Sequence, residues 1–196
     1  MNTWISRRLL KALAFLTLAA CAEGQGPGKA PTGPQTKPMM QAGMLSGAVT
    51  LVAPPGYCID RQSLKPTFAL MARCDTLGAP GFEGNAPLGV ITTSLVAAPP
   101  KQPVPDARQI GETAKVKRVL KTAEGDDMVL LQAEGSAPGA GLSSIHWRGA
   151  ARVGDNMAAV AVYGPEGSPA TGATGRRILT RLIERTRAMT PRPGST

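Results

Sequence analysis

The sequence is poor in the residues from which most catalytic sites are built. It has 196 residues, of which one is a histidine, His146, and aromatic side chains make up only 4% of the chain. One imidazole cannot form a zinc cluster or a catalytic site that needs several histidines, although a one-histidine catalytic group stays open. We therefore expect no metal and no cofactor, and a core built from aliphatic side chains.

The first twenty residues have the layout of an export signal. Arg7, Arg8 and Lys11 precede a short apolar run at 12–20. As a helix this run would rise only about 13 Å, far less than the roughly 30 Å of a bilayer's hydrocarbon core. The pattern predicts a secretory signal over residues 1–20 rather than a membrane-spanning helix.

The signal ends in Leu18-Ala19-Ala20-Cys21, which resembles the lipobox of bacterial lipoproteins. The resemblance implies that Cys21 is acylated with chains such as palmitate, becomes the first mature residue and anchors the protein to a membrane. Because Ala22 rather than aspartate follows, it also implies the outer membrane, facing the periplasm, in a Gram-negative cell. An ordinary signal peptide with a chance cysteine, or a buried helix, is the alternative.

Residues 21–45 contain many glycines and prolines and show no apolar periodicity. This composition predicts a flexible tether behind the lipid, with a proline-rich partner-binding segment as the alternative. Removal of the signal leaves 19 of the 22 Lys and Arg against 13 Asp and Glu. An exported chain without an aromatic-basic motif is not expected to bind nucleic acid, so this surplus favours anionic lipid or an envelope protein as the partner.

Residues 46–190 predict one α+β domain, and 191–196 a disordered tail. Short apolar or β-branched runs predict a mostly antiparallel sheet of about six to seven strands, at 48–52, 68–73, 88–97, 114–121, 128–134, 144–152 and 157–163. An apolar stripe at helical spacing predicts a C-terminal amphipathic helix over 174–189, packed on one face. Asp106 and Gln109 can cap a short helix. The order of elements is similar to that of the PsbP/Mog1-type sandwich, which implies a fold and no function.

Two cysteines remain once Cys21 is assigned to lipid. In an exported chain Cys58 and Cys74 form an even pair, which predicts a structural disulfide. Such a bond contributes roughly 3 kcal/mol for a loop of this size in the chain-entropy model. A reactive thiol or a metal pair is the alternative, although the spacing is not CxxC and only His146 could add an imidazole.

The most suggestive polar segment surrounds the single histidine. Ser143 or Ser144 supplies a hydroxyl and His146 an imidazole, and a nucleophile needs a base within hydrogen-bond reach. On a strand, Ser144 and His146 share one face with Cβ atoms about 7 Å apart, too far without bending. No G-x-S-x-G elbow occurs. We expect instead that His146 and Arg148 lie on the polar face of the strand while Trp147 enters the core.

Charged residues elsewhere have a structural and a functional interpretation. Asp60 and Asp75 flank the cysteines and are expected to cap turns or form salt bridges. A glycine-rich loop leads into the final helix, whose basic face is a candidate for contact with anions or lipid head groups. This face carries Arg176, Arg177, Arg181 and Arg185. A solvated helix face is the alternative.

Together these features predict a lipid-anchored cell-envelope protein of non-catalytic accessory or binding type. The alternative is a small envelope hydrolase that uses His146 with Ser143 or Ser144. A third interpretation is a spacer whose domain binds nothing specific. The sequence specifies neither the ligand nor the partner nor the oligomeric state.

Overall fold

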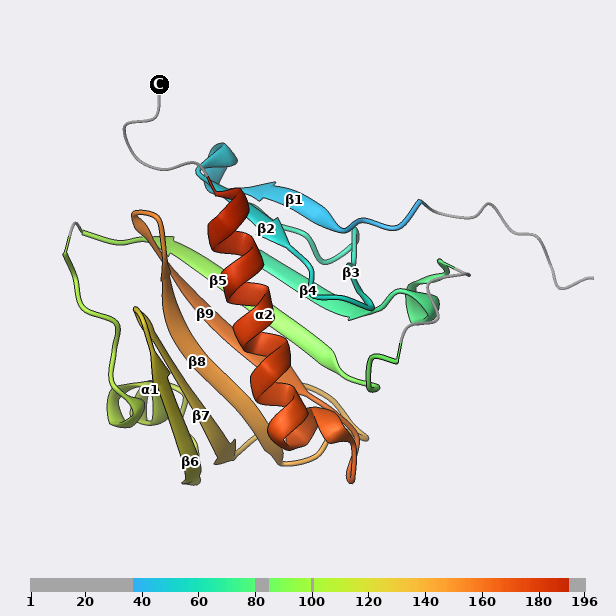
Figure 1. The fold of residues 1–196 in the computed structure, drawn as a ribbon. Helices are drawn as coiled ribbons and strands as arrows, with labels where there is room; N and C mark the ends of the chain where they lie inside the picture. Colours follow the sequence, from blue (N-terminus) through green and yellow to red (C-terminus); the bar gives the residue numbers. More distant parts are fainter. Residues whose placement is uncertain (1–36, 80–84, 100, 191–196) are drawn as a thin grey trace, which may run out of the picture. The chain divides into compact units, whose positions relative to one another are not determined.

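The computed structural model of the chain describes residues 37–79, 85–99 and 101–190. The predicted signal, Cys21, most of the predicted tether and the tail at 191–196 lie outside the described residues. Within them the chain has the predicted α+β fold, with a seven-stranded antiparallel sheet, a small two-stranded sheet and two α-helices (Figure 1).

The large sheet has the strand order β3-β4-β5-β9-β8-β7-β6. Each strand is antiparallel to its neighbours, and β6 to β9 follow one another as a meander. The strands are β3 (Tyr57–Ile59), β4 (Phe68–Arg73), β5 (Val90–Ala97), β6 (Arg118–Gly125), β7 (Met128–Glu134), β8 (Ile145–Val153) and β9 (Asn156–Tyr163). The apolar strand β9 occupies the centre, where a strand buried on both faces is expected.

Most predicted strands lie within two residues of their expected positions, and the exceptions have local causes. The strand predicted over 114–121 begins only at Arg118, because the preceding residues complete the end of a helix, where the Val116 N–H donates to the Gly111 carbonyl. The strand also continues to Gly125, beyond its predicted end, so the hairpin turn is tighter than predicted, with only Asp126 and Asp127 between the strands. The short strand β3 was not predicted, because three residues are too few to show a period.

Helix α2 (Ala173–Met189) covers one face of the large sheet, as the apolar stripe predicts (Figure 1). The buried side chains of this stripe are Ile178, Leu179, Leu182 and Ile183. They pack in one core with the inward-facing side chains of the central strands. The first turn of α2 lies so close to the backbone of Ala170 that a Cβ on Gly175 would overlap the Ala170 carbonyl oxygen. Only glycine fits there.

A hairpin of β1 (Gln41–Met44) and β2 (Val49–Val52), joined by the 3-10 turn η1 (Leu45–Gly47), forms the small sheet. Its side chains enter the same core, and Met44 is only 1% exposed. The predicted domain boundary at residue 46 is therefore too late, since a strand pairs within the segment assigned to the tether. The sequence Gln-Ala-Gly-Met contains no β-branched residue, so its strand depends on pairing with β2 rather than on local preference.

Thr186 of α2 and Thr190, the residue directly after the helix, take the place of a neighbouring strand for β2. The buried Val52 N–H donates to Thr186 Oγ1 at 3.2 Å, and the Thr50 N–H donates to Thr190 Oγ1 at 3.3 Å. Backbone donors on the free side of β2 are thus paired by side chains, which avoids the cost of burying them alone. These two bonds attach the small sheet to the helix.

Helix α1 (Ala107–Thr113) lies on the opposite face of the large sheet. Trp147 contacts α2 at Gly175, whereas the next residue, Arg148, donates to the Ala114 carbonyl at the end of α1. Consecutive residues of a strand point to opposite faces. The predicted capping box is confirmed, because Asp106 accepts from the Gln109 N–H and the Gln109 side chain accepts from the Asp106 N–H.

The two edges of the large sheet differ in length and in protection. The short edge strand β3 has its Ile59 N–H bonded to the Met39 carbonyl. The edge strand β6 is exposed along almost its whole length, and its pairing with β7 shifts register at a bulge between Val119 and Lys121. The remaining short helical turns are η2 (Asp75–Leu77) and η3 (Pro169–Thr171).

Replacing Thr186 by valine tests whether α2 anchors β2 by hydrogen bonding. Valine keeps the shape but removes the acceptor, so the buried Val52 N–H loses its partner. We expect Thr186→Val to lower the free energy of unfolding by about 1–3 kcal/mol in urea denaturation. The control is Thr180→Val on the same helix, where we expect a change within about 0.5 kcal/mol. Equal stability of the two variants would contradict this account.

Candidate functional site

His146 is fully buried and does not lie on an exposed polar face. The expectation for its position is therefore wrong, whereas Trp147 enters the core as predicted. Ser144 is exposed, and its backbone carbonyl, not its hydroxyl, lies 3.1 Å from His146 Nδ1. The Ser143 hydroxyl accepts from the Ile145 N–H at 3.1 Å. Neither hydroxyl is bonded to the imidazole, so the structure does not assemble the predicted nucleophile–base pair.

The surroundings of the imidazole are those of a packed core residue. Its ring lies 4.6 Å from the ring of Tyr163 between centroids, and a Cβ on Gly135 would come 3.4 Å from its Cε1 atom. Because a carbonyl can only accept, the bond to Ser144 places the proton on Nδ1. Burial lowers the pKa of His146, the bond to Ser144 raises it, and the charge of Arg148 lowers it further. His146 is therefore held neutral.

Cys58 and Cys74 form the predicted disulfide, with Cα atoms 4.8 Å apart, and both side chains are buried. The bond links β3 to the residue directly after β4. Asp75 forms the expected salt bridge, here with Arg73, and the side-chain hydrogen bond from Arg73 lowers the pKa of Asp75. The cysteines and this carboxylate thus serve the fold.

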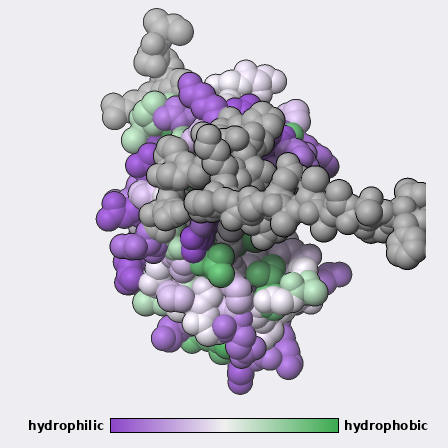
Figure 2. All heavy atoms as spheres, turned by 90° about the vertical axis from the view of Figure 1, so that its right-hand side faces the viewer, coloured by the Kyte–Doolittle hydropathy of each residue, from purple (hydrophilic) through white to green (hydrophobic). Residues whose placement is uncertain are grey.

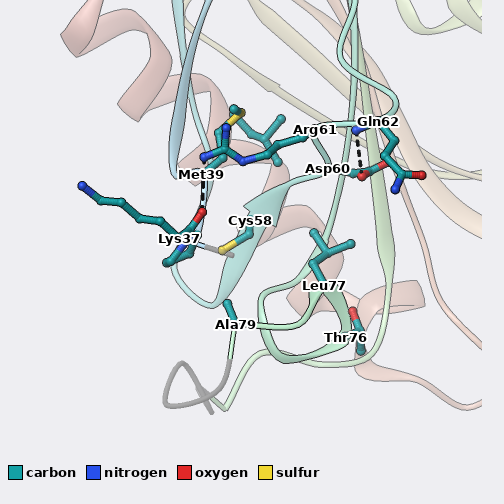
Figure 3. Close-up of a pocket in the computed structure, with 11 residues that line it drawn as sticks. Lys37, Met39, Cys58, Asp60, Arg61, Gln62, Thr76, Leu77 and Ala79 are labelled. Carbon is teal, nitrogen blue, oxygen red and sulfur yellow. Dashed lines mark hydrogen bonds between the residues drawn. The ribbon is translucent and has the colours of Figure 1, made fainter. Parts of the chain in front are cut away.

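A pocket of about 490 Å³ lies beside the disulfide (Figure 3). Asp60 lines it, and its two carboxylate oxygens accept from the backbone N–H groups of Gln62 and Ser63, each at 3.1 Å. Arg61 donates to the Lys37 carbonyl at 3.3 Å. The expected capping role of Asp60 is confirmed, and the side chains of Asp60 and Arg61 are both hydrogen-bonded to the backbone.

The four arginines predicted on the basic face of α2 are all exposed. Three of them, Arg176, Arg177 and Arg181, line a groove of about 530 Å³ beside β6 and β7, together with Glu124 and Glu184. The fourth, Arg185, does not line this groove. Within the part of the chain that the structure describes, none of the four forms an ion pair.

Arg187, near the end of α2, has a different role from the four arginines of the basic face. It donates to the backbone carbonyls of Arg152 at 2.7 Å and Asp127 at 2.8 Å. Burial lowers its pKa, while Asp127, Asp126 and Glu184 raise it. Arg187 therefore anchors the last turn of α2 to the tips of two hairpins.

A second groove, of about 390 Å³, runs between α1 and the outer face of β5, β9 and β8. We call it the α1 groove. Its lining includes Thr92, Ser94, Ile110, Thr113, Arg148, Ala150, Met157, Ala159 and Ala161. Small side chains on three adjacent strands leave this volume open, and the lining is mainly apolar with a few hydroxyl groups and one charge. Such a composition is typical of ligand sites.

The α1 groove could not be found from the sequence, because its walls come from segments far apart in the chain. The one local signal was the alternation of the strand that carries His146 and Arg148, which placed Arg148 on the face away from Trp147. Nothing in the sequence brings Ala114 and the end of α1 to Arg148, a contact that joins residues 34 positions apart.

The described residues contain neither a group of metal ligands nor a helix suited to cross a membrane. There, no three His, Cys, Asp or Glu side chains are grouped as metal ligands would be. None of the described helices combines the length and the apolar character needed to cross a bilayer. On the face shown in Figure 2, outside the grey segments, hydrophobic residues form small patches among hydrophilic ones.

Comparison with known proteins gives no family. No family model matches the chain, and no curated protein matches it. Among solved structures, the Saccharomyces cerevisiae Ran-binding protein Mog1p is similar, with 13% identity and a TM-score of 0.49 over 74% of this chain and 92% of that chain. A point mutant of Mog1 has 13% identity and a TM-score of 0.47 over the same shares. The similarity in element order to the PsbP/Mog1-type sandwich is thus matched by Mog1 structures at low sequence identity. These structures assign neither a function nor a partner to this chain.

The burial of His146 predicts how stability depends on pH. Its folded-state pKa lies below the unfolded value of 6.5, so the unfolded chain takes up the proton first. Stability is then complete above about pH 6.5 and falls as the pH drops below it, by up to about 1.4 kcal/mol per pH unit. Urea denaturation between pH 8 and 5 measures this slope, and His146→Gln should remove it.

The single histidine allows a direct control in the wild-type chain. We expect the titration midpoint of its imidazole NMR signals in the folded state to lie below pH 6.5. A folded-state midpoint at or above 6.5, or an equal slope in His146→Gln, would contradict the buried neutral imidazole.

Proposed function

We propose that this chain is a lipid-anchored protein of the cell envelope that acts as a non-catalytic accessory or binding module. The lipobox-like sequence at Cys21 supports the anchor. The disulfide between Cys58 and Cys74 supports export, because structural disulfides persist in oxidising compartments and are rare in the cytosol.

The observation that carries the non-catalytic assignment is the environment of His146. A general base must lie within hydrogen-bond reach of the proton that it removes. The imidazole is buried, its Nδ1 is bonded to a backbone carbonyl, and its Nε2 has no hydrogen-bond partner in the described part of the chain. The hydrolase alternative with Ser143 or Ser144 has no support from this arrangement.

Binding has better support, because the outer face of the sheet is hollowed at the α1 groove. Its volume of about 390 Å³ falls in the range of roughly 300–1,000 Å³ that is usual for ligand sites. The exposed arginines of α2 offer a second contact surface, for anionic head groups or for an acidic envelope protein. In a cell with two membranes, Ala22 after the anchor favours the outer membrane and a domain in the periplasm.

Phase partition of the protein from its native membrane tests the anchor. We expect the wild-type chain to carry diacylglycerol on Cys21 by mass spectrometry and to enter the detergent phase of Triton X-114. Each buried CH₂ contributes about 0.8 kcal/mol, so several acyl chains hold a protein stably. Cys21→Ala should move it to the aqueous phase.

The matched control removes the other two cysteines. The double variant Cys58→Ala/Cys74→Ala should stay in the detergent phase although it loses the disulfide. A wild-type chain that is found in the aqueous phase with an unmodified N-terminus would overturn the proposal. Crosslinking in intact cells then tests the accessory role, and failure to recover any envelope partner or ligand would count against it.

A further inference from the structure

We propose that the α1 groove binds an apolar monocarboxylic acid, such as a medium-chain fatty acid, whose carboxylate pairs with Arg148. This inference rests on the proposed binding role and names a ligand class for it. Such binding requires a groove floor that can contact the apolar chain of the ligand. It also requires a cation in the groove that can pair with the single carboxylate.

The floor consists of two rows of small residues that cross three strands. In one row Ser94 of β5, Ala159 of β9 and Ala150 of β8 lie side by side in register. In the neighbouring row, Thr92 of β5, Ala161 of β9 and Arg148 of β8 lie side by side in register. Because side chains of one register row share a face, these positions form a shallow channel that ends at the guanidinium.

The walls of the channel are apolar, and its hydroxyl groups are available. Ile110 from α1 and Met157 from β9 line it along with the alanines. The hydroxyls of Thr92 and Thr113 make no hydrogen bond to other groups in the described parts of the chain. A ligand with an apolar body and one polar end matches this distribution.

Arg148 is half-buried and is the one charged residue among those that line the groove. It forms no ion pair in the described parts of the chain, and its single hydrogen bond is a long one, 3.4 Å from Nη1 to the Ala114 carbonyl. A guanidinium has five N–H donors in a fork that fits a carboxylate. Most of its donors are therefore left for a ligand.

The hollows described above beside α2 and beside the disulfide fit an organic acid less well. The groove beside α2 places Glu124 and Glu184 among its three arginines, so its charge is mixed and exposed. In the pocket beside the disulfide, the Asp60 carboxylate is bonded to the backbone and Arg61 to a carbonyl. The α1 groove differs from both in that it joins an apolar floor to a half-buried cation, with no acidic side chain among its lining residues.

The test compares octanoate with octanol, which has the same chain without the charge. The full chain with Cys21→Ala is used, since it carries no lipid that could compete for the groove. Titration with each compound, followed in ¹H–¹⁵N NMR spectra, gives both dissociation constants. We expect octanoate to bind about ten- to a hundredfold more tightly than octanol, with shifts around α1, β8 and β9, as for a charge-assisted hydrogen bond.

Three variants assign the contacts. Arg148→Gln should weaken octanoate to the level of octanol and leave octanol unchanged. Arg108 is an exposed cation on α1, and Arg108→Gln makes the same change in net charge and should alter neither dissociation constant. Ala159→Trp fills the groove from an exposed position, so the protein should stay folded and lose both compounds.

Arg148 has a structural alternative, in which it only caps the C-terminus of α1. In that case Arg148→Gln would lower the stability of α1 without changing the ratio of the octanoate and octanol dissociation constants, and the inference would be overturned. Absence of octanoate binding at millimolar concentration, or binding unaffected by Ala159→Trp, would overturn it as well. None of these results bears on lipidation at Cys21 or on recovery of an envelope partner, so the proposed function would fail separately.

Discussion

The fold depends on one constraint, which is that a single long helix must cover the apolar face of a seven-stranded sheet. The stripe of α2 buries only the central strands, because one helix is much narrower than the sheet. The β1–β2 hairpin supplies the rest of the cover, and Thr186 and Thr190 connect it to the helix by accepting from the backbone of β2. The small sheet, the helix and the large sheet consequently share one hydrophobic core.

The opposite face has a much smaller cover, and this difference shapes the candidate site. Helix α1 has seven residues and contacts mainly β6, β7 and β8. The strands beyond it carry small side chains on this face, which limits the apolar area exposed to water and leaves the α1 groove open. Strand alternation then divides neighbouring residues between the two environments, so that Trp147 is in the core while Arg148 faces the groove.

Local sequence patterns were sufficient to predict the elements that are determined by residues close together in the chain. The strand at 68–73 and the capping box of α1 occur where predicted, and α2 begins only one residue early, because alternation, capping and the helical stripe are short-range signals. The strand β1 and the burial of His146 were not predictable in this way. One depends on pairing with β2, and the other on Tyr163, which lies beside it only after β8 and β9 have paired.

The edge strand β6 has a consequence for how copies of this chain can meet. Its outer backbone groups have no strand partner in the described structure, and such an edge can recruit a second chain. Lys117 and Arg118 share one carboxylate, that of Glu134, and Lys121 adds further positive charge. Charged side chains along an edge strand disfavour pairing with another chain, and the bulge between Val119 and Lys121 interrupts the register that pairing would need. A second chain is therefore hindered from extending the sheet at β6. Crowded copies can stay separate instead of pairing edge to edge into continuous β-structure.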